Sequence, residues 1–451
     1  MGDRVEIRID GLSHDGQGVG RHDGMACFVP GALPGERVAV RLLHRARRHW
    51  LTALEAVLET SLSRRRPPCI LADHCGGCSL QHLRDDLQSR WKGERVQEAL
   101  ERIGGLTTPV EAVVAAPACL GYRNRAIVPL ERRADGSLRA GYYRRGTHRI
   151  VNMNHCPVLD PRLDALIAPL KQDLEASGWP VDRELEGQGG LRHLALRLGH
   201  HTGEVLLTLV SSHAELEGLA SRAEAWRTRW PQIVGVTLNL QPQPTNTLLG
   251  PHTELVAGRS WLRERFCGEE LRIASDTFFQ VNTAQAERVL PSLQHALEGL
   301  TPGLLVDAYC GIGTFSLPLA RGGWRVHGLE RNPEAVRLAA LNASINGLSE
   351  LASFEAGDVA ALLPPWLPRC QALFLDPPRR GLDGAVMAAL QASSPPLLLY
   401  LSCDPATLAR DLGLLTRSCG YTVSRVQPLD FFPQTSHIET LAVLRRAEPS
   451  S

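Results

Sequence analysis

The stretch LLVDAYCGIGTF, residues 304–315, decides the fold of the second half of this chain. It begins with an apolar run typical of a buried strand. Two glycines, Gly311 and Gly313, follow at once, ahead of a segment with helical spacing. A Gly-x-Gly turn lets a ligand approach the backbone closely beside the N-terminus of a helix. The stretch therefore predicts the first strand and the ligand-binding turn of an α/β domain.

The pattern of strand, turn and helix repeats towards the end of the chain, which predicts a parallel, doubly wound, Rossmann-like sheet. Strands are expected at residues 304–308, 325–329, 353–356, 372–375, 397–402, 421–427 and 438–444. We expect the sixth of these strands to run parallel to the others and the seventh to return antiparallel. The loop between them would then lie at the carboxyl ends of the parallel strands.

Acidic residues stand at or near the ends of four successive strands: Asp307, Glu330, Asp358 and Asp376. Ligands of open α/β sheets bind at the carboxyl ends of the strands, so these acids are expected in one crevice, where Glu330 can accept both hydroxyls of a ribose. Each acid alone could be a helix cap, but together they favour a nucleoside ligand. The turn lacks the third glycine of GxGxxG, so S-adenosylmethionine is a better candidate than a nicotinamide cofactor.

A cysteine is expected at the same end of the sheet, because Cys403 directly follows the strand 397–402. Uracil C5 is too weak a nucleophile to attack a methyl sulfonium, but a thiolate that adds to C6 makes C5 nucleophilic. A base must afterwards remove the C5 proton. Glu439, at the start of the return strand, is the candidate base, and His437 is its competitor. The segment Asp376-Pro377-Pro378 taken alone would instead suggest an amino-methyltransferase.

Residues 278–440 resemble the bacterial RNA uracil-5-methyltransferase family. The resemblance rests on five segments in the family order: FQVN (279–282), DAYCGIG (307–313), DPPR (376–379), SCDP (402–405) and HIET (437–440). It implies that Cys403 is the nucleophile and Glu439 the base. The implied S-adenosylmethionine-binding residues are Gln280, Tyr309, Gly311, Gly313, Glu330, Asp358 and Asp376. Thr314 departs from the pattern, since the family has an asparagine there.

The N-terminal residues of the chain have a β-rich pattern without the helical spacing seen near the C-terminus. Short β-rich runs at 5–9, 26–29, 37–42 and 50–58 alternate with glycine-bearing turns, which predicts a small β-barrel. The stretches GLSHDGQGVGR (11–21) and FVPGALPGERVAVRL (28–42) resemble the TRAM domain, an OB-like RNA-binding barrel.

Positive charge is concentrated in the front half, although the formal net charge of the chain is only +1. Residues 121–150 hold eight arginines against one glutamate and one aspartate, and a second arginine cluster spans 41–66. Clustered arginines favour binding to a polyanion such as RNA.

Four cysteines form a candidate metal site: Cys69, Cys75, Cys78 and Cys156. Four thiolates suit zinc and an iron–sulfur cluster equally well. The spacing Cys-x5-Cys-Gly-Gly-Cys resembles one branch of the family, which methylates 23S ribosomal RNA and has a TRAM domain and a [4Fe-4S] cluster. The resemblance implies such a cluster here, with 23S ribosomal RNA as the partner.

These features predict three domains. Residues 1–60 are expected to form the TRAM-like barrel, 61–270 an α+β central domain with the cluster and the basic surface, and 271–451 the methyltransferase domain. Residues 81–103 have the apolar spacing of an amphipathic helix. The resemblance implies that residues 87–118 pack on the catalytic domain.

Three other functions stay open at this point: a transfer RNA uracil-5-methyltransferase, an RNA cytosine-5- or amino-methyltransferase, and an RNA-binding iron–sulfur protein with an inactive methyltransferase domain. The N-terminal residues lack the apolar core of a signal peptide, and no run of about 18 apolar residues occurs. We therefore expect a cytosolic enzyme without a membrane partner, and no obligate protein partner is evident.

Overall fold

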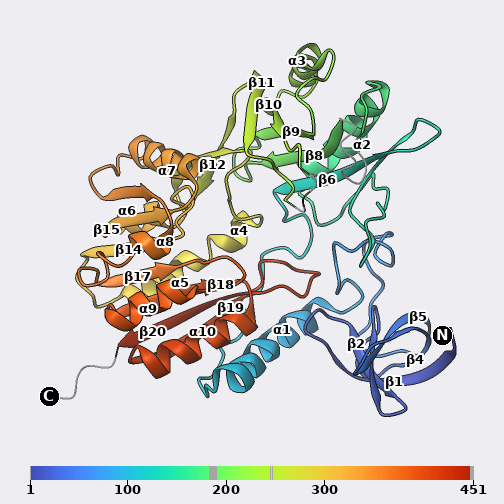
Figure 1. Ribbon diagram of the computed structural model, residues 1–451, viewed down its shortest axis with the longest axis horizontal. Helices are drawn as coiled ribbons and strands as arrows, with labels where there is room; N and C mark the ends of the chain where they lie inside the picture. Colours follow the sequence, from blue (N-terminus) through green and yellow to red (C-terminus); the bar gives the residue numbers. More distant parts are fainter. Residues whose placement is uncertain (1, 182–189, 244, 246, 447–451) are drawn as a thin grey trace.

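The computed structural model of the chain describes residues 2–181, 190–243, 245 and 247–446. Figure 1 shows a small barrel at the N-terminal end, a central sheet with helices, and a second sheet covered by helices towards the C-terminal end. None of the helices in these ranges is long and apolar enough to cross a membrane.

The N-terminal part is a closed barrel with the strand order β1-β2-β3-β5-β4. Its strands are β1 (Arg4–Leu12), β2 (Gly18–His22), β3 (Met25–Val29), β4 (Arg37–Arg45) and β5 (His49–Glu59). The predicted barrel is thus confirmed, but β2 was not among the predicted strands, because a glycine-rich strand carries little apolar signal. Gly20 is nevertheless required there, since a Cβ atom at this position would lie 2.3 Å from the carbonyl oxygen of Arg8.

The central part contains a six-stranded sheet with the order β11-β10-β9-β8-β6-β7 and a two-stranded sheet of β12 and β13. The strands are β6 (Arg125–Arg132), β7 (Leu138–Ala140), β8 (Leu191–Leu198), β9 (Val205–Ser211), β10 (Ile233–Leu240), β11 (His252–Gly258), β12 (Trp261–Phe266) and β13 (Glu269–Ala274). The helices are α2 (Pro161–Ala176) and α3 (Leu219–Arg229). Apolar side chains of α2, α3 and the sheet form one buried core.

The C-terminal part is a seven-stranded sheet with the order β16-β15-β14-β17-β18-β20-β19. The strands are β14 (Leu304–Ala308), β15 (Arg325–Glu330), β16 (Ala352–Ala356), β17 (Ala372–Leu375), β18 (Leu397–Ser402), β19 (Tyr421–Leu429) and β20 (Glu439–Arg446). The helices are α4 (Thr283–Ala286), α5 (Val289–Leu297), α6 (Ser316–Arg321), α7 (Pro333–Ile345), α8 (Val359–Leu362), α9 (Gly384–Ala392) and α10 (Pro405–Ser418).

All seven predicted strands of this sheet are present, and β20 runs antiparallel between β18 and β19. The Rossmann-like fold and the antiparallel return are therefore confirmed. The register pairs Ser402 with Thr440, so the C-terminal end of β18 lies beside the start of β20.

A helix from the front of the chain completes the catalytic part. Helix α1 (Asp85–Ala99) continues into a π-helical segment, η1 (Leu100–Gly104), and both contact α10. In Figure 1 this blue helix leaves the barrel and lies beneath the red helix α10. The following segment joins β19, because the backbone N–H of Glu111 donates to the carbonyl of Val426 at 2.9 Å.

Candidate active site

The turn after β14 has a left-handed backbone at one tyrosine and two glycines. Tyr309, Gly311 and Gly313 have φ angles of 72°, 56° and 83°. The backbone N–H of Gly311 donates to a carboxylate oxygen of Glu330 at 3.1 Å, and the other carboxylate oxygen accepts from the N–H of Asn332 at 2.7 Å. Glu330 is thus fixed beside the turn at the end of β15, where a ribose-binding acid was predicted.

Among the other predicted cofactor residues, Tyr309 lies in this turn, Asp358 and Asp376 follow the strands β16 and β17 of the sheet, and Gln280 lies between β13 and α4. Burial raises the pKa of Asp376, at the end of β17, to about 7, with a further contribution from the charge of Asp307. Burial raises the pKa of Tyr309 to about 12, and Asp383 and Asp358 add to the shift. Gln280 is buried, and its backbone carbonyl accepts from the side-chain amide of Asn124 at 2.8 Å.

Asp358, a predicted cofactor residue, has a structural role in the fold. Its side chain caps α8 by accepting from the backbone N–H of Ala360 at 2.9 Å. An N-cap of this kind satisfies a donor that the helix itself leaves open. The side chain is exposed, in contrast to the buried Asp307 in β14.

Cys403 lies between the end of β18 and the start of α10, and it is partly buried. Burial, together with the charge of Glu439, raises the pKa of its thiol to about 12, whereas Arg379 opposes the shift. The thiol is therefore protonated at neutral pH in this state. Arg379 and the N-terminus of α10 are the features that favour the thiolate.

Glu439 and His437 are the two candidate bases at the start of β20, and their electrostatic surroundings differ. Burial raises the pKa of Glu439 well above its usual value, with the charge of Asp376 adding to the effect. Burial lowers the pKa of His437 to about 4, and the neighbouring charge of Arg379 lowers it too. A carboxylate with a raised pKa is a stronger proton acceptor than an imidazole with a lowered one. When it is ionised, Glu439 is therefore the stronger proton acceptor of the two.

The four predicted metal ligands line one cavity: Cys69, Cys75, Cys78 and Cys156. Backbone N–H groups of Leu71 and Gly77 donate to the sulfurs of Cys69 and Cys75, each at 3.4 Å. The guanidinium of Arg123 also lines the cavity, and its Nε has no hydrogen-bond partner in the described part of the chain. In those same ranges no three side chains of His, Cys, Asp or Glu form a group that could hold a single metal ion.

Comparisons with known proteins agree with this architecture. The TRAM domain family matches residues 1–53, and the family described as tRNA (Uracil-5-)-methyltransferase matches residues 368–447. An RNA methyltransferase of Parasynechococcus marenigrum is 51% identical, and the alignment covers 98% of this chain and 96% of the relative. The chain belongs to the RNA uracil-5-methyltransferase family. It is an S-adenosylmethionine-dependent RNA methyltransferase.

More distant members of this RNA methyltransferase family match over the full length as well. An RNA methyltransferase of Halalkalibacterium halodurans is 36% identical over 98% of this chain and 97% of the relative. The crystal structure of the tRNA (uracil-54, C5)-methyltransferase of Pyrococcus abyssi in complex with S-adenosyl-L-homocysteine is 27% identical, with a TM-score of 0.79, covering 97% of this chain and 99% of that one.

Two residues of this methyltransferase have roles that the sequence did not predict. Arg379 is the last residue of the DPPR segment, and its charge acts on both Cys403 and Glu439. Its position directly after the strand-end Asp-Pro-Pro was an available signal. Asp307 is 1% exposed, accepts a hydrogen bond from Ser316 and has one oxygen, Oδ1, without a partner in the described ranges. The sequence identified Asp307 only as a strand-end acid and as the first residue of the DAYCGIG segment, and it did not indicate that this side chain is buried.

The thiol of Cys403 should respond in opposite directions to two neighbouring substitutions. Glu439→Gln removes a charge that raises the thiol pKa, so alkylation of Cys403 at a fixed pH between 7 and 9 should become faster. Arg379→Gln removes the opposing charge, so alkylation should become slower. Below the thiol pKa, each rate should rise about tenfold per pH unit, because only the thiolate reacts.

The measurement is iodoacetamide labelling of the Cys403 peptide, followed by mass spectrometry, with urea-unfolded protein as the control for intrinsic reactivity. Equal labelling rates in the wild type and both variants would show that neither charge acts on the thiol.

Proposed function

We propose that the protein methylates C5 of a uridine in structured RNA, with Cys403 as the covalent nucleophile and Glu439 as the base. The observation that carries the proposal is the register of β18 and β20, which sets the residue before Cys403 opposite the residue after Glu439. A nucleophile and a base on adjacent strand ends can act on C6 and C5 of one pyrimidine ring.

The proposed reaction has three steps. The Cys403 thiolate adds to C6, and the electrons of the C5–C6 double bond move to the O4 side as an enolate. C5 then attacks the methyl group of S-adenosylmethionine, whose sulfur–methyl bond breaks to leave S-adenosylhomocysteine. Finally the Glu439 carboxylate takes the C5 proton, the C5–C6 double bond re-forms, and the carbon–sulfur bond breaks to release Cys403.

The residues around the glycine turn would hold the methyl donor. Glu330 is already oriented by two backbone N–H groups, which suits a carboxylate that accepts ribose hydroxyls. Bound in this place, the donor would lie next to the nucleophile, because β14, β17 and β18 are adjacent strands. The rest of the proposed set is Gln280, Tyr309, Asp358 and Asp376, with the turn at Gly311 and Gly313.

The proposed RNA target is 23S ribosomal RNA, on the resemblance of the TRAM barrel and the cysteine spacing to that branch of the family. Transfer RNA is the second candidate, because the structurally similar protein from Pyrococcus abyssi is named as a tRNA methyltransferase. The test is to map 5-methyluridine in both RNAs from cells with and without the gene. Loss of the modification from 23S RNA alone supports the first candidate, and loss from transfer RNA alone the second. Methylcytosine or an N-methylated base in place of 5-methyluridine would contradict the proposal.

The cysteine cavity is proposed to hold a [4Fe-4S] cluster with a structural role. The donor set fits this group: four cysteines line one cavity, backbone N–H groups donate to two of the sulfurs, and the guanidinium of Arg123 can balance negative charge. Brown, anaerobically purified protein with iron and sulfide would support the cluster. Colourless protein with one zinc ion per chain would contradict the cluster and would identify zinc as the bound metal.

The proposed RNA surface includes the hairpin around residues 141–150, which is exposed at Arg144, Arg145 and Arg149. This hairpin is hydrogen-bonded to the loop that carries Cys75 and Cys78, since the backbone N–H of Gly76 donates to the carbonyl of Tyr143 at 2.9 Å. By contrast, the guanidinium of Arg132 binds backbone carbonyls, including that of Trp179 at 3.0 Å, so Arg132 serves the fold of the central domain.

Replacing Arg144, Arg145 and Arg149 together with glutamine should weaken RNA binding and its dependence on salt. For every phosphate that the variant no longer neutralises, the slope of log affinity against log salt should fall by about 0.7–0.9. The measurement is a filter-binding titration at several salt concentrations. Arg337→Gln on α7 is the matched control, since Arg337 is an exposed arginine paired with Glu334. An unchanged slope in the triple variant would place the RNA elsewhere.

A further inference from the structure

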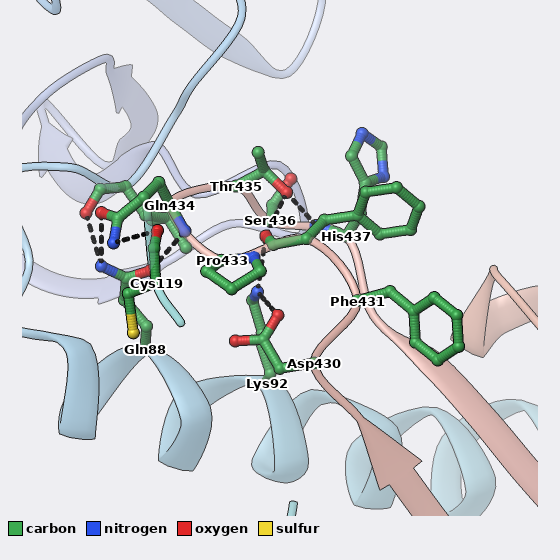
Figure 2. A network of polar contacts seen from close by, with 12 residues as sticks. Gln88, Lys92, Cys119, Asp430, Phe431, Pro433, Gln434, Thr435, Ser436 and His437 are labelled. Carbon is green, nitrogen blue, oxygen red and sulfur yellow. Dashed lines mark hydrogen bonds and ion pairs between the residues drawn. The ribbon is translucent and has the colours of Figure 1, made fainter. Parts of the chain in front are cut away.

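The loop between β19 and β20, residues 430–438, ends where the proposed base begins. Figure 2 shows that this loop lies on helix α1, while His437 points away from the helix. We call residues 430–438 the base loop. The base loop leads directly into Glu439, which is the first residue of β20 and is paired with Leu429 of β19.

Gln434, in the middle of the base loop, has an unusual backbone. Its φ angle is 71°, and its exposed fraction is 0%. Glycine adopts this left-handed conformation without a steric penalty, whereas a residue with a Cβ atom does not. A glutamine held in this state inside the protein must therefore be fixed by its surroundings.

Gln434 forms hydrogen bonds with five residues that precede the catalytic domain: Arg65, Leu80, Asp85, Gln88 and Cys119. Its backbone N–H donates to the side-chain oxygen of Gln88 at 2.9 Å, and its carbonyl accepts from the N–H of Leu80 at 2.9 Å. Its side-chain amide donates to Asp85 at 2.8 Å, and its side-chain oxygen accepts from Arg65 at 2.7 Å. The residue is thus bound through both its backbone and its side chain.

The ends of the base loop are tied to the same segment. The ammonium of Lys92, which is 0% exposed, forms an ion pair with Asp430 at 2.6 Å (Figure 2). The backbone N–H of Ser436 donates to the hydroxyl of Ser79 at 3.1 Å, and the guanidinium of Arg95 donates to the carbonyl of Ser436 at 2.7 Å. The base loop therefore takes its shape from α1 and the residues before it, although Lys92 and Asp430 are 338 residues apart in the sequence.

We infer that Gln434 is a positioning residue for the reaction: its contacts with α1 and the 65–80 segment hold the base loop so that Glu439 lies at the C5 proton. This inference rests on the proposed roles of Cys403 and Glu439. A glycine would satisfy the backbone of the loop without strain, but only a side chain with an amide donor and acceptor reaches both Asp85 and Arg65. The glutamine thus ties the loop to the front of the chain.

The inference makes a specific kinetic prediction, because Glu439 acts only after the methyl group has been transferred. Gln434→Gly should leave covalent addition by Cys403 near its wild-type rate. It should slow the decay of the methylated protein–RNA adduct at least about tenfold, since a displacement of about 1 Å costs a catalytic group roughly 100-fold in rate. Methylated adduct should therefore accumulate during a single turnover with methyl-labelled S-adenosylmethionine.

Two further variants complete the experiment. Gln434→Asn tolerates a left-handed backbone but is too short for both partners, and it should give the same adduct if the glycine variant folds poorly. Gln427→Ala is the matched control, because Gln427 also links β19 to the preceding segment, through Glu111 at 3.0 Å, but lies outside the base loop. It should release product at the wild-type rate.

A purely structural role for Gln434 would lower adduct formation and decay together, in proportion to the folded fraction, and would overturn the inference. Wild-type decay in both Gln434 variants would overturn it too. Cys403→Ala and Glu439→Gln are measured in parallel. If Cys403→Ala forms adduct or Glu439→Gln resolves it normally, the proposed function fails and the inference with it. If both behave as proposed and only the Gln434 variants do not, the inference alone fails.

Discussion

Cys403→Ala should form no covalent complex with RNA and should lose methylation activity by roughly 10⁴-fold or more, because removal of a covalent nucleophile leaves only binding and orientation to catalyse the reaction. Without the thiolate, C5 of uracil never becomes nucleophilic enough to attack the methyl donor. Binding of S-adenosylmethionine should be unchanged, since its proposed ligands lie on other strands. The measurements are a denaturing gel for the adduct and a filter assay for methyl transfer.

Cys419→Ala provides the control, because Cys419 caps the C-terminal end of α10 while Cys403 precedes its N-terminal end. Both variants change one cysteine next to the same helix, but only one should lose activity. Adduct formation by Cys403→Ala would assign the nucleophile to another residue.

The order of strands and turns at this end of the sheet could be predicted from the sequence, because it depends on local patterns. An apolar run of strand length, a Gly-x-Gly turn and an acid after the next strand are contiguous features. Their places in the sheet follow from the rule that parallel strands expose their carboxyl ends together. The antiparallel return of β20 followed from the same reasoning, and it brought Glu439 to the strand next to Cys403.

The parts that could not be predicted depend on contacts between distant segments. Lys92 is a charged residue in a helix, and nothing near it in the sequence indicates that it is buried against Asp430. Gln434 has the sequence context of an ordinary loop residue, and its left-handed backbone has no signal without a glycine. The helix expected at 81–103 is present but begins at Asp85, its last turn is π-helical, and Ile103 is 50% exposed.

The sequence predicted the basic segment from its number of arginines, but it could not predict which of these side chains are exposed. Arg132 and Arg144 contributed equally to the basic segment in the sequence, but the first binds backbone carbonyls of its own domain and the second is exposed. Asp358 likewise caps a helix in addition to its proposed contact with the cofactor. Local patterns identify the chemical type of a side chain, whereas its partner depends on the tertiary structure.

Glu439→Gln should fail at a later step than Cys403→Ala, and this difference separates the two roles. The variant keeps the thiolate and the methyl donor, so it should add to C6 and transfer the methyl group. C5 then carries both a methyl group and a proton. Glutamine cannot accept that proton, so the double bond cannot re-form and the thioether cannot leave.

We therefore expect Glu439→Gln to accumulate a methylated protein–RNA adduct and to lose turnover by about 10²–10⁴-fold, the usual contribution of a general base. Removing the carboxylate also removes a charge that raises the pKa of Cys403, so adduct formation should be at least as fast as in the wild type. His437→Gln is the control and should release product. If Glu439→Gln turns over normally while His437→Gln traps the adduct, the base is His437, despite a pKa that burial lowers to about 4.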